Sequence, residues 1–160
     1  MPLPALTLPP EKDSTHLRIL LDVQATLRSL PVPLYDIGSR VFCGITERSD
    51  SYSFPCVVLY PAAQGETQTE VDCGDIETRY PVEVRLMGRA DTIEVEQLPY
   101  YLRWRQQVRE AFPRYVPLTN VSGFRRIEFV GLPPFDSRDP KYLELHSVMQ
   151  FVVAVVTPTP

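Results

Sequence analysis

The chain has 160 residues, a formal net charge of -4 and an isoelectric point near 5.2. This length is typical of one domain with a core large enough to fold without disulfides or metals. The acidic balance argues against a general binder of nucleic acids or membrane surfaces, because phosphate binding depends on clustered Lys and Arg.

Prolines are concentrated at both ends of the chain and between its periodic segments. There are seventeen prolines against seven glycines, and proline stiffens a connection by fixing φ. We therefore expect a single domain over residues 1–160, with extended arms at 1–12 and 157–160. The N-terminal residues lack the basic region and apolar run of a signal peptide, and no segment reaches the ~20 apolar residues of a membrane span. We expect a soluble protein that is used inside a cell and contacts no membrane.

The sequence lacks the motifs of common catalytic and metal sites. Cys43, Cys56 and Cys73 are widely spaced and include no CxxC pair, which predicts reduced thiols and neither a zinc site nor a disulfide framework. There is no Gly-rich phosphate loop, HExxH or GxSxG motif. His16 is expected at a helix start, and His146 in a strand with no nucleophile placed beside it. We predict no enzyme activity, no catalytic residue, no metal and no cofactor.

The first predicted element is an amphipathic helix over residues 13–30. Asp13 or Ser14 can cap it by accepting a hydrogen bond from a backbone donor of the first turn. Apolar residues then recur at spacings of three and four, which places them on one stripe, while polar residues fall largely off it. The stripe holds Leu17, Leu20, Val23, Leu27 and Leu30, and the polar side holds Arg18, Asp22, Gln24 and Arg28.

Two strands are predicted in the first half of the chain. Residues 54–60 form a short apolar run typical of a buried strand. From Ile76 the alternation of residues predicts a long strand, with one apolar face (Tyr80, Val82, Val84, Leu86) and with Glu83 and Arg85 on the other. Between the two strands, the threonines of residues 64–77 allow an exposed hairpin arm. Residues 35–48 fit either a short strand or a loop.

A second helix is predicted to begin near Leu98 and to end at Pro113. Pro99 fits the first turn of this helix, because its missing N–H has no partner there anyway. The spacing of Asp91 and Glu94 is that of a capping box, which predicts a helical turn just before it. The packed stripe is expected to contain Tyr101, Trp104 or Arg105, Val108, Ala111 and Phe112, with Arg103, Gln107 and Glu110 facing outward.

Two strands, at 124–130 and 142–156, complete the chain. The last strand has one register that is apolar almost throughout. Its other register begins polar (Glu144, His146, Gln150) and ends apolar (Val152, Ala154, Val156). We expect it to start against solvent, to end between two layers, and to pair with the strand from Ile76, because both are long and alternate alike.

The order of elements predicts an α+β fold. It consists of a mostly antiparallel sheet of about four strands with two main helices packed on one face. An extended acidic hairpin or loop and the proline-rich terminal arms complete it.

Residues 64–77 carry five acidic side chains and no Lys or Arg. Three interpretations remain open: a solvated loop, a metal site, for which the spacing of a calcium loop is missing, and an arm lining a channel that DNA crosses without sticking. The candidates for such a lumen or inter-ring arm are Glu66, Glu70, Asp72, Asp75 and Glu77.

Residues 100–110 interleave aromatic side chains with arginines, as nucleic-acid stacking surfaces do. At helical spacing the aromatic residues are expected in the core and the arginines on the outer face, where they can meet carboxylates of a neighbouring subunit. The candidate subunit-interface residues are Arg103, Arg105, Arg109, Val152 and Val156.

The succession of segments resembles the tail-terminator (tail-completion) proteins of tailed bacteriophages. The likeness rests on an N-terminal amphipathic helix, the strand PCVVLYP, the strand RYPVEVRLMGRAD turning directly into a helix, and the late strands RRIEF and ELHSVMQFVVAVV. It covers about Leu17 to Val156, by order and pattern without a diagnostic motif.

The resemblance implies a structural virion protein that is assembled in the host cytoplasm. Such subunits form a six-fold homo-oligomeric ring on the head-proximal end of the tail tube and dock the neck of the capsid. The implied partners are further copies, the tail tube protein and a head-tail connector or neck protein, with DNA passing through the lumen unbound. Head-tail stopper or neck proteins share this pattern. A cytosolic α+β enzyme or small-molecule binder, with a site such as Tyr80, Arg85, Trp104 and His146, is the alternative from another class.

Overall fold

The computed structural model describes residues 14–30, 40–44, 56–89, 98–133 and 144–159. The elements are α1 (Thr15–Arg28), β1 (Val41–Cys43), β2 (Cys56–Pro61), β3 (Thr67–Glu70), a 3₁₀ turn (Asp72–Gly74), β4 (Ile76–Arg89), α2 (Leu98–Ala111), β5 (Phe124–Val130) and β6 (Glu144–Thr157).

The strands of the described residues form one six-stranded sheet. Its order is β1-β2-β4-β6-β5, and β3 pairs separately with β4. Only β1 and β2 run parallel, and the other described pairs are antiparallel. The predicted α+β class is confirmed. The sheet has more strands than expected because the short strands β1 and β3 add to its sides.

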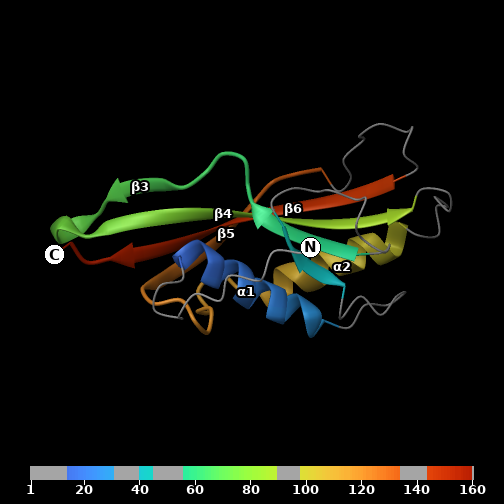
Figure 1. The fold of residues 1–160 in the computed structure, drawn as a ribbon, viewed down its shortest axis with the longest axis horizontal. Coiled ribbons are helices and arrows are strands. Elements are labelled where there is room, and N and C mark those ends of the chain that lie inside the picture. Colours follow the sequence, from blue (N-terminus) through green and yellow to red (C-terminus); the bar gives the residue numbers. More distant parts are fainter. Residues whose placement is uncertain (1–13, 31–39, 45–55, 90–97, 134–143, 160) are drawn as a thin grey trace, which may run out of the picture.

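The central feature of the sheet is the pairing of β4 with β6. It extends from Ile76 opposite Thr157 to Arg89 opposite Glu144, which confirms the expected partnership of the two long strands. β3 lies beside the first residues of β4, and β2 lies beside the later ones. Figure 1 shows β4 and β6 running along the whole length of the molecule.

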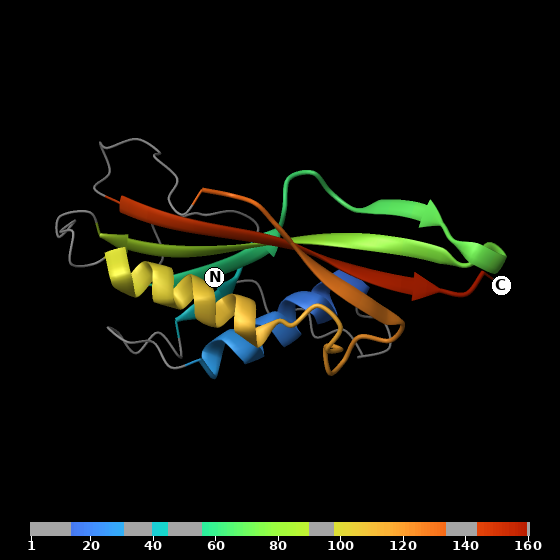
Figure 2. The same ribbon diagram turned by 180° about the vertical axis from the view of Figure 1, so that it is seen from behind.

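Both helices cover the same face of the sheet, as Figures 1 and 2 show. Alternate residues of β4 and β6 pack against them, so one continuous core forms between the two layers. Phe151 lies fully buried in it, with its ring centroid 5.3 Å from those of Phe112 and Phe129. The core includes Ile19, Val23, Leu59, Val82, Val84, Trp104, Val108, Met149, Phe151 and Val153.

The first helix begins where the sequence predicts, but the residues that it buries differ from the predicted set. The hydroxyl of Ser14 accepts a hydrogen bond from the Leu17 N–H at 3.1 Å, which confirms the cap. Leu17, expected in the core, is 37% exposed, whereas Ile19 is fully buried. Asp22, expected outward, is buried and accepts hydrogen bonds from Asn120 N and Nδ2 at 2.8 and 2.6 Å. The loop after α2 therefore covers a face of α1 that helical spacing alone assigns to solvent.

The second helix also begins and ends as expected, at Leu98 and Ala111. Tyr101, Trp104 and Val108 are buried in the core, as the sequence predicts. The capping box at Asp91 and Glu94 lies outside the described residues, as does the arm at 1–12.

Burial along β6 does not change in the expected way. His146 and Gln150, expected against solvent, are buried, whereas Val152 and Val156, expected between layers, are half-buried. These residues face away from the helices, toward charged side chains of β4 and β5. Ala154, in the same register, is almost fully buried. Ion pairs between side chains of β4 and β5 cross over it.

Candidate functional site

The sheet face away from the helices carries a group of charged side chains, here called the arginine cluster. Its residues come from β4, from β5 and from the loop after α2, so β6 lies between its two halves. Alternation places Glu77 and Arg79 of β4, and Arg126 and Glu128 of β5, on one face. Arg125 lies at an irregularity in the pairing of β5 with β6, between Phe124 and Arg126, and contacts Glu77. The cluster comprises Glu77, Arg79, Arg114, Arg125, Arg126 and Glu128.

Two diagonal bridges of the cluster cross over β6 at Ala154. Arg79 on β4 and Arg126 on β5 are both register partners of Ala154. Arg126 donates to both carboxylate oxygens of Glu77 on β4, at 2.8 and 2.9 Å. Arg79 donates to Glu128 Oε2 on β5 at 2.6 Å. The small side chain of Ala154 leaves room for these long side chains, so ion pairs of the same subunit cover the apolar end of β6.

Positive charge exceeds negative charge in the cluster. Among the described residues, four guanidinium groups share two carboxylates. Arg114 and Arg125 make the longest of these contacts, at 3.2 and 3.4 Å, and their side chains are 58% and 50% exposed. The cluster therefore presents two exposed cations whose charge its own carboxylates do not neutralise.

The hydrogen bond from Arg126 lowers the pKa of Glu128, and the charges of Arg126 and Arg79 add to the effect. Because the folded pKa lies below the unfolded one, the ionised carboxylate stabilises the fold above the unfolded pKa. This stability is lost as the pH falls through the folded pKa.

We therefore expect Glu128→Gln to lower the free energy of unfolding by about 1 kcal/mol at pH 7, and by less as the pH falls below about 4.3, the ordinary pKa of Glu. Urea unfolding followed by far-UV circular dichroism between pH 7 and pH 3 measures this. Glu110→Gln, at an exposed position of α2, is the matched control. A Glu128→Gln loss that is equal at every pH would contradict the expectation.

A second polar group lies on the same sheet face, beside β2. Arg85 donates to Tyr60 Oη at 3.0 Å, to Glu83 Oε1 at 2.7 Å and to His146 Nδ1 at 3.0 Å, and Tyr60 also donates to Glu83. Burial and the hydrogen bond to Glu83 raise the pKa of Tyr60 far above its ordinary value. The phenol therefore remains protonated and acts as a hydrogen-bond donor.

The four residues suggested for an enzyme or small-molecule site do not come together. Arg85 and His146 contact each other on the face away from the helices. Trp104 is buried in the core on the helix side, and Tyr80 packs against that core. The sheet separates the two pairs.

Residues 64–77 form the expected hairpin arm. β3 pairs with the start of β4, and all its residues are exposed. Glu70 and Asp72 are exposed and Asp75 is half-buried, whereas Glu77 is buried in the arginine cluster. Glu66 lies 3.1 Å from Nδ1 of His16, whose Nε2 is 3.2 Å from the Pro81 carbonyl oxygen. The base of the arm is thus fixed to the start of α1.

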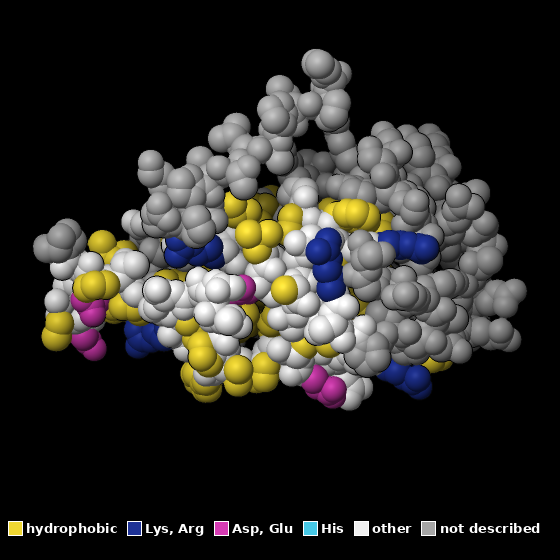
Figure 3. Space-filling model, turned by 60° about the horizontal axis from the view of Figure 1, so that its bottom comes forward, with side chains coloured by type: hydrophobic (Ala, Val, Ile, Leu, Met, Phe, Trp, Pro, Cys, Tyr) yellow, Lys and Arg dark blue, Asp and Glu magenta, His cyan; other side chains and the backbone are white. Residues whose placement is uncertain are grey.

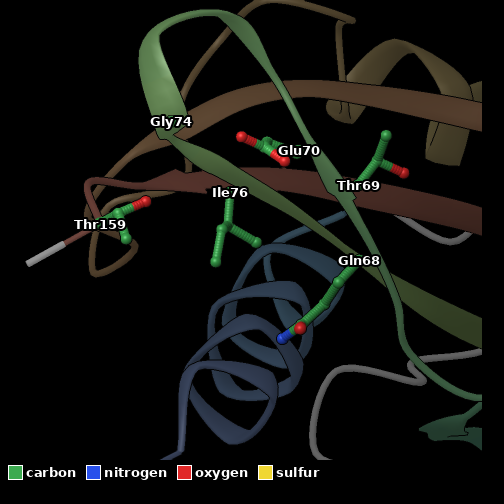
Figure 4. Close-up of a pocket in the computed structure, with 6 residues that line it drawn as sticks. All are labelled: Gln68, Thr69, Glu70, Gly74, Ile76 and Thr159. Atoms are coloured by element: carbon green, nitrogen blue, oxygen red, sulfur yellow. The ribbon is translucent and has the colours of Figure 1, made fainter.

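A hollow of about 380 Å³ lies at the tip of the arm. Figure 4 shows polar side chains and the apolar side chain of Ile76 around it. The described residues include no group of three or more His, Cys, Asp or Glu arranged to hold a metal ion. The residues that line the hollow are Gln68, Thr69, Glu70, Gly74, Ile76 and Thr159.

The arginines of α2 divide into two kinds. Arg103 and Arg109 are exposed, as a subunit interface requires. Arg105 is buried and donates to Ser147 Oγ at 3.2 Å and to the Val148 carbonyl at 2.5 Å. Arg105 therefore connects α2 to β6 inside the subunit, and Val152 and Val156 lie half-buried on the opposite sheet face.

The described cysteines carry free thiols. Cys56 is buried, whereas Cys43 and Cys73 are exposed. None of the helices in the described ranges is long and apolar enough to cross a membrane.

Comparison with known proteins yields a match of fold. No protein-family model and no curated protein matches the sequence. Among solved structures, the chain resembles one from "Virion of native gene transfer agent (GTA) particle", with a TM-score of 0.60 and 15% identity. The shared fold occurs in a virion. The match covers 87% of this chain and 95% of that chain, so the two share nearly their whole architecture.

Proposed function

We propose that this chain is a structural protein of a phage-like virion, and that it forms the ring that ends the tail tube on the side of the capsid. The observation that carries the proposal is the match to a virion chain over 95% of that chain's length. The resemblance of the sequence pattern to tail terminators adds the specific role. A head-tail stopper or neck protein is the second candidate, since both classes share this succession of elements.

The shape of the subunit is suited to assembly. The β4–β6 pair forms a stiff ribbon that continues past the helices (Figure 1), with the arm of β3 at its end. In a ring, the exposed acidic side chains of this arm would face the lumen or an adjacent ring. DNA would pass such a wall without binding, because like charges repel.

An enzymatic role has less support from the described residues. The candidate residues Arg85 and His146 lie on the opposite side of the sheet from Trp104. The raised pKa of Tyr60 also keeps its phenol protonated, so the phenol does not act as a base. The polar contacts around Arg85 instead fill the buried part of this face.

The proposal is tested with the purified full chain and tail tubes of the same virion. We expect size-exclusion chromatography with light scattering to show a ring-sized species, alone or on adding tubes. Negative-stain images should show one tube end capped, and tubes that are capped early should stop growing. A strict monomer that ignores tubes would contradict the proposal. A ring that binds only tubes that are already terminated would favour the stopper or neck role.

A further inference from the structure

We propose that neighbouring copies of this chain join through opposite, oppositely charged edges of the sheet. The acidic edge formed by residues 70–75 of one copy would dock on the exposed arginines, Arg114 and Arg125, of the next. The inference rests on the proposed ring function and extends it by naming both surfaces of the subunit contact. It assigns residues 70–75 to that contact in place of the lumen or an adjacent ring.

The two surfaces lie on opposite edges of the same end of the sheet. At this end the strand order is β3-β4-β6-β5, because β3 pairs with the start of β4 and β5 pairs with the end of β6. Figures 1 and 2 show β3 and β5 on either side of the β4–β6 pair. Three strand spacings of about 4.8 Å separate them, so the two edges of one copy do not meet.

The β3 edge is open and acidic. Within the described residues, β3 pairs with β4 alone, so the backbone groups of its outer edge have no strand partner. Glu70, Asp72 and Asp75 make no ion pair in the described part of the chain, and no Lys or Arg occurs between residues 64 and 77. Figure 3 shows acidic side chains gathered at this tip of the molecule.

The β5 edge carries exposed arginines, where the β3 edge has an unpaired strand. The Ile127 N–H donates to the Arg114 carbonyl at 2.8 Å, so the loop after α2 covers this edge and holds Arg114 beside it. Arg114 and Arg125 are at least half exposed, and each makes one long contact to a carboxylate of the cluster. A guanidinium has five N–H donors arranged to bind carboxylates in pairs. The remaining donors suit carboxylates from another copy.

This contact leads to a ring by symmetry. Because the acidic edge and the arginine edge are different surfaces, the contact is heterologous, and each copy keeps one edge for the next. Repetition produces a closed ring when the rotation closes and a filament otherwise. A pair that used the same surface on both copies would place like charges together.

The experiment reverses each edge separately in the full chain. One variant carries Glu70→Lys and Asp72→Lys, and the other carries Arg114→Glu and Arg125→Glu. Glu77, Arg126 and Glu128 stay unchanged in both, so circular dichroism should match the parent chain. The arginine reversal should melt somewhat earlier, because its new glutamates lie beside Glu77 and Glu128. We expect each variant alone to associate at least about 100-fold more weakly, because like charges would face each other.

Mixing the two variants should restore assembly. Each lysine edge would then meet a glutamate edge, so the mixture should form rings of alternating copies with an even number of subunits. Association of the parent chain should also weaken as salt rises. If a reversed variant fails to fold, the neutral pairs Glu70→Gln/Asp72→Asn and Arg114→Gln/Arg125→Gln should still weaken association. Mixing these two should restore only every second contact, which gives pairs of copies and no rings.

The control reverses two exposed arginines of α2, with Arg103→Glu and Arg109→Glu, and should assemble like the parent chain. The inference is overturned if both edge variants assemble normally, if their folded mixture stays monomeric, or if only the α2 control loses assembly. In each of those cases the ring function still holds. A parent chain that never assembles, alone or on tubes, overturns the proposed function itself.

Discussion

Replacing Glu77 with alanine should lower the free energy of unfolding by about 3 kcal/mol. The Glu77 side chain is 7% exposed, accepts two hydrogen bonds from Arg126 and forms a longer ion pair with Arg125. Its removal leaves a guanidinium without its main partner, and breaking a buried pair in this way costs about 3–5 kcal/mol. We expect the lower end, because the Arg126 side chain is 19% exposed and keeps Glu128. Urea unfolding at pH 7 measures the change.

Glu70→Ala is the matched control, because this carboxylate lies on the exposed arm. It should change stability by no more than about 0.5 kcal/mol. The double variant Glu77→Ala/Arg126→Ala should lose less than the two single losses added together, because it leaves no unpaired charge. Equal effects of Glu77→Ala and Glu70→Ala would show that the pairs across β6 contribute nothing.

Gly123→Ala should lower the free energy of unfolding by about 2–4 kcal/mol. Gly123 has a φ of +72°, which disfavours alanine, and an added Cβ would lie 2.2 Å from the carbonyl oxygen of Val156. The backbone has little freedom to move away, because the Val156 N–H donates to the Gly123 carbonyl at 2.8 Å. The close approach holds the start of β5 to the end of β6. Thermal unfolding of the purified variant tests it.

Gly131→Ala provides the comparison, since a Cβ there meets no heavy atom within 4 Å. Its stability should stay within about 0.5 kcal/mol of the parent chain. If Gly123→Ala melts at the same temperature as Gly131→Ala, the contact between β5 and the end of β6 is looser than the structure indicates.

The sequence predicts the elements with a strong period. The two helices, the long strands and the pairing of β4 with β6 follow from apolar spacing, because a buried face must repeat at 3.6 or 2 residues. The sequence of β1 fits either a strand or a loop, since three residues are too few for a period. The buried face of α1 was misplaced because the loop that covers it comes from residues far along the chain.

Periodicity in the sequence does not predict the arginine cluster. Its pairs join β4 and β5 across β6, and sequence spacing does not say which strands become neighbours on either side of a third. One signal in the sequence is Ala154, which interrupts a run of larger apolar residues. A position that long side chains cross requires a small residue. The charge of Glu77 groups it with the arm, whereas its place in the alternation of β4 directs its side chain to the cluster.

The position of β6 in the sheet constrains how the chain folds while it is being made. At the arm end, β6 lies between β4 and β5, although it is synthesised after both. The pair Thr157 and Ile76 lies 81 residues apart in sequence, and contacts so distant form late because a long loop must close first. Until residues 144–157 leave the ribosome, the inner edges of β4 and β5 have no partner and expose apolar strands to other nascent chains. A newly made subunit must therefore complete β6 before it contacts other copies, although contact between copies is its proposed function.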